Sequence, residues 1–115
     1  MKNMIIKKEN RVRHENSPNC IVHEYPLGDK NIDVAIAQIN GRYPDKGFAT
    51  NEEVNEIIYV VKGVGKVVID GKEHKLSDGD ALLIRSKQKY FFEGELKLVI
   101  SCNPAWYLKQ YKTIE

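Results

Sequence analysis

Two consecutive β-hairpin patterns between residues 51 and 94 constrain the fold of this chain more than any other feature. Residues 66–69 and 72–76 form two short runs, and only Asp70-Gly71 separates them. That pair readily supplies the positive φ angles of a two-residue type I′ turn, so it predicts a hairpin at this point. Ser77-Asp78-Gly79-Asp80 marks a second turn, and the apolar run of residues 81–84 follows it. The region therefore predicts antiparallel β-structure.

Strand patterns also flank this region on both sides. Residues 21–25 and 96–102 fit strands, and Asn103-Pro104 stops the second of them. Residues 32–40 alternate between two faces, one with Ile32, Val34 and Ile36 and the other with Asp33, Ala35, Ala37 and Ile39. No convincing helical period of 3.6 residues appears before the C-terminus. We therefore predict an all-β fold.

The length of the chain limits it to a single domain over residues 1–115, because 115 residues suffice for one hydrophobic core. The longest apolar runs cover only a few residues, so we expect no membrane span. The 18 basic and 16 acidic residues are interspersed along most of the chain, which argues against a nucleic-acid partner. The N-terminal residues lack the apolar segment of a secretory signal, and this predicts a cytoplasmic protein.

The two cysteines and three histidines give no metal-binding pattern. Cys20 and Cys102 are far apart and belong to no Cys-x-x-Cys motif, so we expect both to be reduced and buried. A reactive thiol at Cys102 stays an alternative. We expect His74 to be exposed, and His14 and His23 to be surface or hydrogen-bonded strand residues rather than ligands.

The glutamate, glycines and turns of this region resemble the two-part signature of the cupin superfamily. Glu56 and Gly63 are in register with the glutamate and glycine of the first motif, which spans about residues 41–63. The second motif spans about residues 71–94, where Gly71 is followed in register by Ser77-Asp78-Gly79. The resemblance implies a single-domain jelly-roll barrel, or double-stranded β-helix, with a functional site at its centre.

The metal-binding histidines of cupins have no counterparts in this chain. Their positions fall on Ala49 and Asn51, or on Thr50 and Glu52, and for the third histidine on Tyr90. A carboxylate and a phenol replace several converging imidazoles poorly, so we expect no cofactor and no tightly bound transition metal. Weak binding of a hard cation by Glu52, Glu56 and Tyr90 stays open.

Glu56 and Tyr90 are the catalytic candidates, because the resemblance places both in the central cavity. Period-two alternation puts Ile58 and Val60 on the same face as Glu56, which gives an acidic group an apolar floor. Burial raises the pKa of such a carboxyl, and a neighbouring tyrosine hydroxyl can donate to it or transfer a proton. The alternative for Glu56 is a structural carboxyl satisfied by hydrogen bonds.

We predict ligand contacts from five further residues: Arg42, Tyr43, Asn51, Glu52 and Phe92. Arg42 and Tyr43 belong to a Gly-Arg-Tyr-Pro loop that would lie near the barrel mouth in cupins. The guanidinium of an arginine suits a carboxylate or a phosphate. A surface ion pair of Arg42 with Asp45 or Glu52 is the alternative.

The two ends of the chain carry apolar and aromatic residues. Residues 103–115 form a tail with three large aromatics, Trp106, Tyr107 and Tyr111, which we expect to cover the barrel or contact a second subunit. Residues 1–13 include the apolar residues Met4, Ile5 and Ile6, and this segment can add a strand to a second subunit. Together with the resemblance, this predicts a homodimer.

These observations predict a protein that binds a small polar metabolite, for which sugar-derived and carboxylated compounds are both considered. The alternative is a metal-independent isomerase, epimerase or lyase, in which Glu56 and Tyr90 transfer protons and Arg42 holds an anionic substrate. Metal-dependent dioxygenase chemistry is disfavoured, because its histidine ligands are missing.

Overall fold

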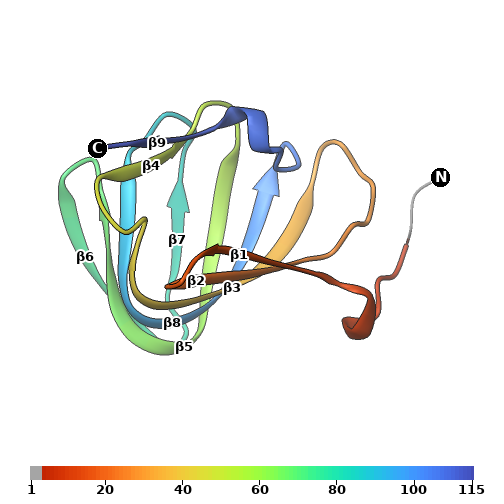
Figure 1. Cartoon of the computed structure of the whole chain (residues 1–115), viewed down its shortest axis with the longest axis horizontal. Coiled ribbons are helices and arrows are strands. Elements are labelled where there is room, and N and C mark those ends of the chain that lie inside the picture. The colour runs from red at the N-terminus through yellow and green to blue at the C-terminus, as the bar shows by residue number, and fades with distance from the viewer. Residues whose placement is uncertain (1–3) are drawn as a thin grey trace.

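The computed structural model describes residues 4–115, which form one curled antiparallel sheet of nine strands (Figure 1). The strands are β1 (Val12–Ser17), β2 (Cys20–Glu24), β3 (Asp33–Tyr43), β4 (Phe48–Asn51), β5 (Asn55–Ile69), β6 (Lys72–Ser77), β7 (Ala81–Ile84), β8 (Tyr90–Asn103) and β9 (Tyr111–Ile114). The helical turns of this part are two short 3-10 helices, η1 (Lys8–Asn10) and η2 (Leu108–Gln110). The prediction of an all-β fold is confirmed.

The strand order is β1-β2-β3-β8-β4-β9, and β5 pairs with β6, β7 and β8. Figure 1 shows the sheet curling so that β4 and β9 lie across from β1, β2 and β3. The hydroxyl oxygens of Tyr43 on β3 and Tyr111 on β9 are 2.6 Å apart, and this hydrogen bond joins the two sides. The curl therefore encloses a space between strands that are distant in the sheet.

The strands β5 and β8 run side by side over almost their whole lengths, with one register shift between Val60 and Lys62. The residues on both sides of Gly63 thus belong to one strand. Gly63 has a φ of +121°, and a Cβ at this position would collide with the backbone oxygen of Glu95. A glycine therefore lets the two backbones approach closely without ending the strand.

The hairpin predicted at Asp70-Gly71 is confirmed. Ile69 pairs with Lys72, so the two intervening residues form the whole loop. Both have a positive φ, 50° at Asp70 and 81° at Gly71, as a type I′ turn requires.

The predicted alternation of β5 is also confirmed. Glu56, Ile58 and Val60 are buried, whereas Ile57 and Tyr59 are exposed on the outer face. Of the two alternating faces predicted for residues 32–40, the one with Asp33, Ala35, Ala37 and Ile39 lines the cavity. Period-two alternation therefore places one carboxyl from each of two strands inside the barrel.

The C-terminal segment packs onto the barrel of its own chain. β9 pairs with β4, and the Trp106 ring lies against that of Tyr111 with centroids 5.7 Å apart. At the other end β1 pairs with β2 of the same chain, while Met4 and Ile5 are exposed. The first three residues of the segment predicted to reach a second subunit lie outside the described residues. No helix between residues 4 and 115 is long and apolar enough to cross a membrane.

Candidate functional site

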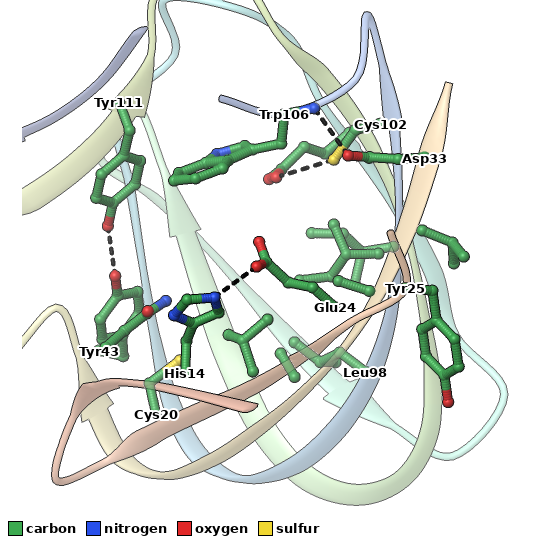
Figure 2. A pocket seen from close by; sticks show the side chains of 18 of the residues that line it. His14, Cys20, Glu24, Tyr25, Asp33, Tyr43, Leu98, Cys102, Trp106 and Tyr111 are labelled. Carbon is green, nitrogen blue, oxygen red and sulfur yellow. Dashed lines mark hydrogen bonds and ion pairs between the residues drawn. The ribbon is translucent and has the colours of Figure 1, made fainter. Parts of the chain in front are cut away.

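A cavity of about 590 Å³ lies inside the curled sheet and opens at one side. Residues of β1, β2, β3, β5 and β8 line it, together with the segment around Trp106, Leu108 and Tyr111. Figure 2 shows Asp33, Cys102 and Trp106 at one end and Tyr43 and Tyr111 at another. Most of the wall is apolar or aromatic, so the few polar groups that face the cavity decide which ligands fit.

Three polar side chains from adjacent strands form a row across the wall. Asp33 on β3 pairs with Cys102 on β8, and Cys102 pairs with Glu56 on β5. The Cys102 thiol donates a hydrogen bond to Glu56, with Sγ 3.6 Å from Oε2. The backbone N–H of Trp106 donates to Asp33 Oδ2 at 3.0 Å (Figure 2). Both carboxyl groups are therefore fixed by neighbours and face the same space.

Burial governs the acid/base behaviour of Glu56, which is only 6% exposed. Its pKa is raised from 4.5 to about 7, mainly by desolvation and further by the charge of Asp33. The hydrogen bond from Cys102 and the nearby Asn51 amide lower the pKa and only partly offset these effects. Burial likewise raises the pKa of Asp33. Near neutral pH Glu56 can therefore give or take a proton.

Tyr90 lines the same cavity as Glu56, from β8. Its ring packs edge-on against Phe92 with centroids 5.8 Å apart, and its hydroxyl makes no hydrogen bond to any residue from 4 to 115. Burial and the nearby Glu56 raise the pKa of Tyr90 well above its usual value. The phenol therefore stays protonated, so it is suited to donate a hydrogen bond rather than to act as a base.

A His-carboxylate pair forms another part of the wall. His14 on β1 and Glu24 on β2 lie together, with Nε2 2.8 Å from Oε1, and form an ion pair when the imidazole is protonated (Figure 2). Both side chains line the cavity and are about half exposed. Sequence reasoning missed this pair because β1 is polar and shows no strand pattern. The inward alternation of β2 was the available signal, since Cys20, Val22 and Glu24 all line the cavity.

Only two of the five residues predicted to contact a ligand line the cavity. Tyr43 and Phe92 line the cavity, whereas Arg42, Asn51 and Glu52 are not among the lining residues.

Arg42 instead organises the loop that follows β3. Its guanidinium donates to the carbonyls of Pro44 and Gly47 at 2.7 and 3.0 Å and lies 3.9 Å from the ring centroid of Phe91. The predicted ion pairs with Asp45 and Glu52 are not formed, and Glu52 is exposed beside Lys112. These contacts hold Arg42 outside the cavity. It is therefore not placed to bind an anionic substrate there, as the sequence had predicted.

Asn51 is 1% exposed and lies behind the cavity wall. Its Oδ1 accepts hydrogen bonds from Trp106 Nε1 at 3.1 Å and from Gln110 Nε2 at 2.7 Å. Its role is therefore to tie the C-terminal segment to β4. Its amide nitrogen is close enough to lower the pKa of Glu56 but makes no hydrogen bond of proper geometry with the described residues.

The donor set does not fit a histidine-type metal site. Ala49 offers no ligand atom, and the Asn51 oxygen is already bonded to Trp106 and Gln110. The Glu56 carboxyl accepts a hydrogen bond from the Cys102 thiol. Within residues 4–115 no three His, Cys, Asp or Glu side chains are grouped to hold a metal ion. The residues present therefore do not fit a transition metal bound by histidines.

Comparisons with known proteins agree on the fold. The family model for the cupin domain matches residues 45–100. The nucleoside dehydratase Pac13 superimposes with a TM-score of 0.89 at 15% identity, covering 98% of this chain and 92% of that chain. A Streptomyces Pac13 variant with uridine gives 0.89 at 16% identity, covering 100% and 93%. KdgF from Halomonas sp. gives 0.72 at 16% identity, covering 90% and 96%. No curated protein matches the sequence.

Proposed function

Because the chain is a small protein of the cupin superfamily, we propose that its central cavity binds an uncharged, ring-containing polar metabolite without a tightly bound transition metal. The observation that carries this proposal is the combination of aromatic walls with inward carboxyl groups in one cavity. Aromatic rings bury the flat faces of a ligand, and the carboxyl groups accept hydrogen bonds from its hydroxyl or N–H groups.

The size of the cavity suits a single small molecule. Ligand pockets commonly span roughly 300 to 1,000 Å³, and the volume of about 590 Å³ falls within that range. A nucleoside is small enough for this cavity and combines a flat ring with several hydroxyl groups. Uridine, which is bound in structures of Streptomyces Pac13, is therefore a suitable first probe.

The charges around the cavity favour a neutral ligand over an anionic one. No lysine or arginine of residues 4–115 is among its lining residues, whereas Glu24, Asp33 and Glu56 are. A phosphate or carboxylate placed there would lose its hydration without gaining a cationic partner. Of the metabolite classes considered from the sequence, the carboxylated one thus loses its support.

The test is a thermal-shift and calorimetric comparison of uridine with uridine monophosphate. We expect the nucleoside to bind more tightly, because its phosphorylated form adds charge next to carboxylates. Tighter binding of the phosphorylated compound would contradict the charge argument. The comparison extends to a panel of neutral sugars and their phosphorylated or carboxylated counterparts, and the anionic member of each pair should bind less well.

A matched pair of variants locates the binding site. Ala35 lines the cavity, whereas Ala81 is exposed at the start of β7. Ala35→Phe places a ring in the space meant for the ligand and should abolish binding. Ala81→Phe adds the same ring to the outer surface and should leave binding intact. Equal binding by both variants would place the ligand elsewhere.

A metal-independent isomerase, epimerase or lyase is the second candidate, and the pKa of Glu56 near 7 favours it. In this reading Glu56 exchanges the proton and Tyr90 donates a hydrogen bond to the reacting oxygen. Turnover of a bound compound that is lost in Glu56→Gln and Tyr90→Phe, while its affinity survives, would support the enzyme. Binding without conversion would support a sensor or carrier.

The homodimer and the cytoplasmic location stay predictions. Ile57, Tyr59 and Leu83 are exposed on the outer faces of β5 and β7, where a second subunit can cover them. Size-exclusion chromatography with light scattering tests the dimer, and a mass near that of one 13.2 kDa chain would reject it.

A further inference from the structure

The row formed by Asp33, Cys102 and Glu56 is defined by strand register rather than by chance contact. Cys102 is the direct cross-strand partner of both carboxyl residues. Residues that face each other in this way project to the same side of the sheet, with neighbouring strands about 4.8 Å apart. The thiol therefore stands between two carboxyl groups on one wall of the cavity.

Within this row the thiol has one proton to offer to two carboxyl groups. Its hydrogen bond to Glu56 is seen directly, with Sγ 3.6 Å from Oε2. A hydrogen bond between Cys102 and Asp33 also contributes to the pKa of Asp33. Burial raises the pKa of the thiol itself, so it keeps its proton. Cys102 is thus suited to relay a proton, and its raised pKa argues against the reactive thiol considered from the sequence.

Within residues 4–115, no lysine or arginine lines the cavity to balance the two carboxyl groups. The guanidinium of Arg11 donates a hydrogen bond at 3.3 Å to the hydroxyl of Tyr25, which lines the cavity. Ile84, the cross-strand partner of Glu56 on β7, has no titratable group. The other titratable groups that line this space are Tyr90 from β8, Tyr43 from β3, Tyr111 from β9, Tyr25 after β2, and His14, Cys20 and Glu24 from β1 and β2.

One buried amide and one hydroxyl on the cavity wall lie near the row without a hydrogen-bond partner in residues 4–115. The amide nitrogen of Asn51 and the hydroxyl of Tyr90 make no hydrogen bond with the described part of the chain. Both residues affect, or are affected by, the ionisation of Glu56. The Asn51 amide nitrogen is a buried donor without a partner, which is costly in a folded protein. The Tyr90 hydroxyl lines the cavity, where it can meet a ligand.

We propose that Asp33 is the second acid/base group of this cavity and that it shares one proton with Glu56 through the Cys102 thiol. In one state Glu56 carries the proton and Asp33 is ionised. In the other, Glu56 passes its proton to the sulfur while the thiol passes its own to Asp33, so the proton count and the total charge are unchanged. The row then offers the cavity one hydrogen-bond donor and one acceptor with a single negative charge.

Glu56 thus exchanges its proton with Asp33 rather than with Tyr90. The sequence paired Glu56 with Tyr90, but the tyrosine stays protonated and cannot accept the proton that Glu56 releases. Asp33 is placed to accept it, because it is the cross-strand partner of Cys102 on the side opposite Glu56, and burial raises the pKa of Asp33. Two interacting carboxyl groups titrate as a pair, with each site sensing the protonation of the other.

A carbon-13 NMR titration of the side-chain carboxyl carbons tests the proposal without any ligand. In the wild-type protein we expect the Glu56 signal to titrate near pH 7 and the Asp33 signal to show a second inflection at the same pH. Asp33→Asn removes a like charge and should move the Glu56 midpoint to lower pH. Cys102→Ala removes a hydrogen bond to the ionised form and should move it to higher pH, whereas Cys102→Ser keeps a donor and should change it less.

Two further variants make the result decisive. Asp45→Asn removes an exposed carboxyl from the loop between β3 and β4 and should leave the Glu56 midpoint unchanged. Glu56→Gln should remove the second inflection of Asp33. If Asp33→Asn and Asp45→Asn give the same Glu56 midpoint, or if the Asp33 signal is unaffected by Glu56→Gln, the shared proton is refuted.

A second experiment measures ligand binding at different pH values. It rests on the proposed function, and its result is interpreted separately from the titration. A neutral ligand such as uridine displaces water from Glu56 and favours its protonated form, so binding should take up a proton and weaken as the pH rises through 7. Asp33→Asn should move this weakening to lower pH. If uridine does not bind, the proposed function fails for this probe, while the ligand-free titration still decides the proton sharing.

Discussion

The buried carboxyl of Glu56 should make the stability of this protein depend on pH in a way that one substitution removes. Its pKa rises from 4.5 to about 7 on folding, a difference of about 2.5 units. At about 1.36 kcal/mol per unit, this corresponds to about 3 kcal/mol of folding free energy. Solvent screening reduces the figure little, because the side chain is 6% exposed.

The sign follows from the proton bound by each state. A carboxyl whose pKa is higher in the folded state holds its proton more tightly there, so folding is favoured below pH 4.5, where both states are protonated. Between pH 4.5 and 7 the unfolded state ionises first, and the free energy of unfolding falls. Above pH 7 the penalty is complete. Glu56→Gln carries no charge at any pH and should therefore lose this fall.

Urea unfolding followed by circular dichroism measures the effect. The free energy of unfolding of Glu56→Gln minus that of the wild type should grow by about 3 kcal/mol between about pH 4 and pH 8.5. Glu95→Gln, which removes an exposed carboxyl on β8, serves as the control and should give a nearly constant difference. A constant difference for Glu56→Gln as well would refute the claim that burial perturbs this carboxyl.

Three further predictions concern the packing and the site. Ile58→Ala should cost about 3 kcal/mol of unfolding free energy, because Ile58 is fully buried, whereas Ile57→Ala on the outer face should cost less than about 1 kcal/mol in the same urea titration. Gly63→Ala should cost about 3 kcal/mol from its positive φ and backbone collision, while Gly71→Ala, with open space around it, should cost about 1 kcal/mol; equal costs would contradict the close approach of β5 and β8. Tyr90→Phe should change thermal stability little, since its hydroxyl has no partner among residues 4–115, but should weaken ligand binding in calorimetry.

Local sequence patterns predicted the fold and part of the site because they act over short distances. The hairpin at Asp70-Gly71 follows from backbone preferences of two residues, and the burial of Glu56 follows from alternation along one strand. Glu56 and Tyr90 do line one cavity, as the resemblance implied. That both residues function there stays a prediction.

The remaining features depend on which strands become neighbours. Alternation grouped Asp33 with Ala35 on one face, but that this face is the inner one, and that Asp33 aligns with Glu56, depended on the register of β3 and β5 on either side of β8. The His14–Glu24 pair required a polar strand, β1, to fold onto β2. Arg42 met backbone carbonyls of its own loop, and side-chain spacing in the sequence carries no information about such contacts.

Trp106 gives the protein a built-in optical reporter. It is the single tryptophan of the chain, its ring lines the cavity, and its N–H is held by Asn51. The indole emission therefore originates from one known location, and a molecule that displaces water from this ring should alter its wavelength or intensity. Unlabelled protein can be screened against compound collections by fluorescence alone, without attaching a dye or knowing the reaction in advance.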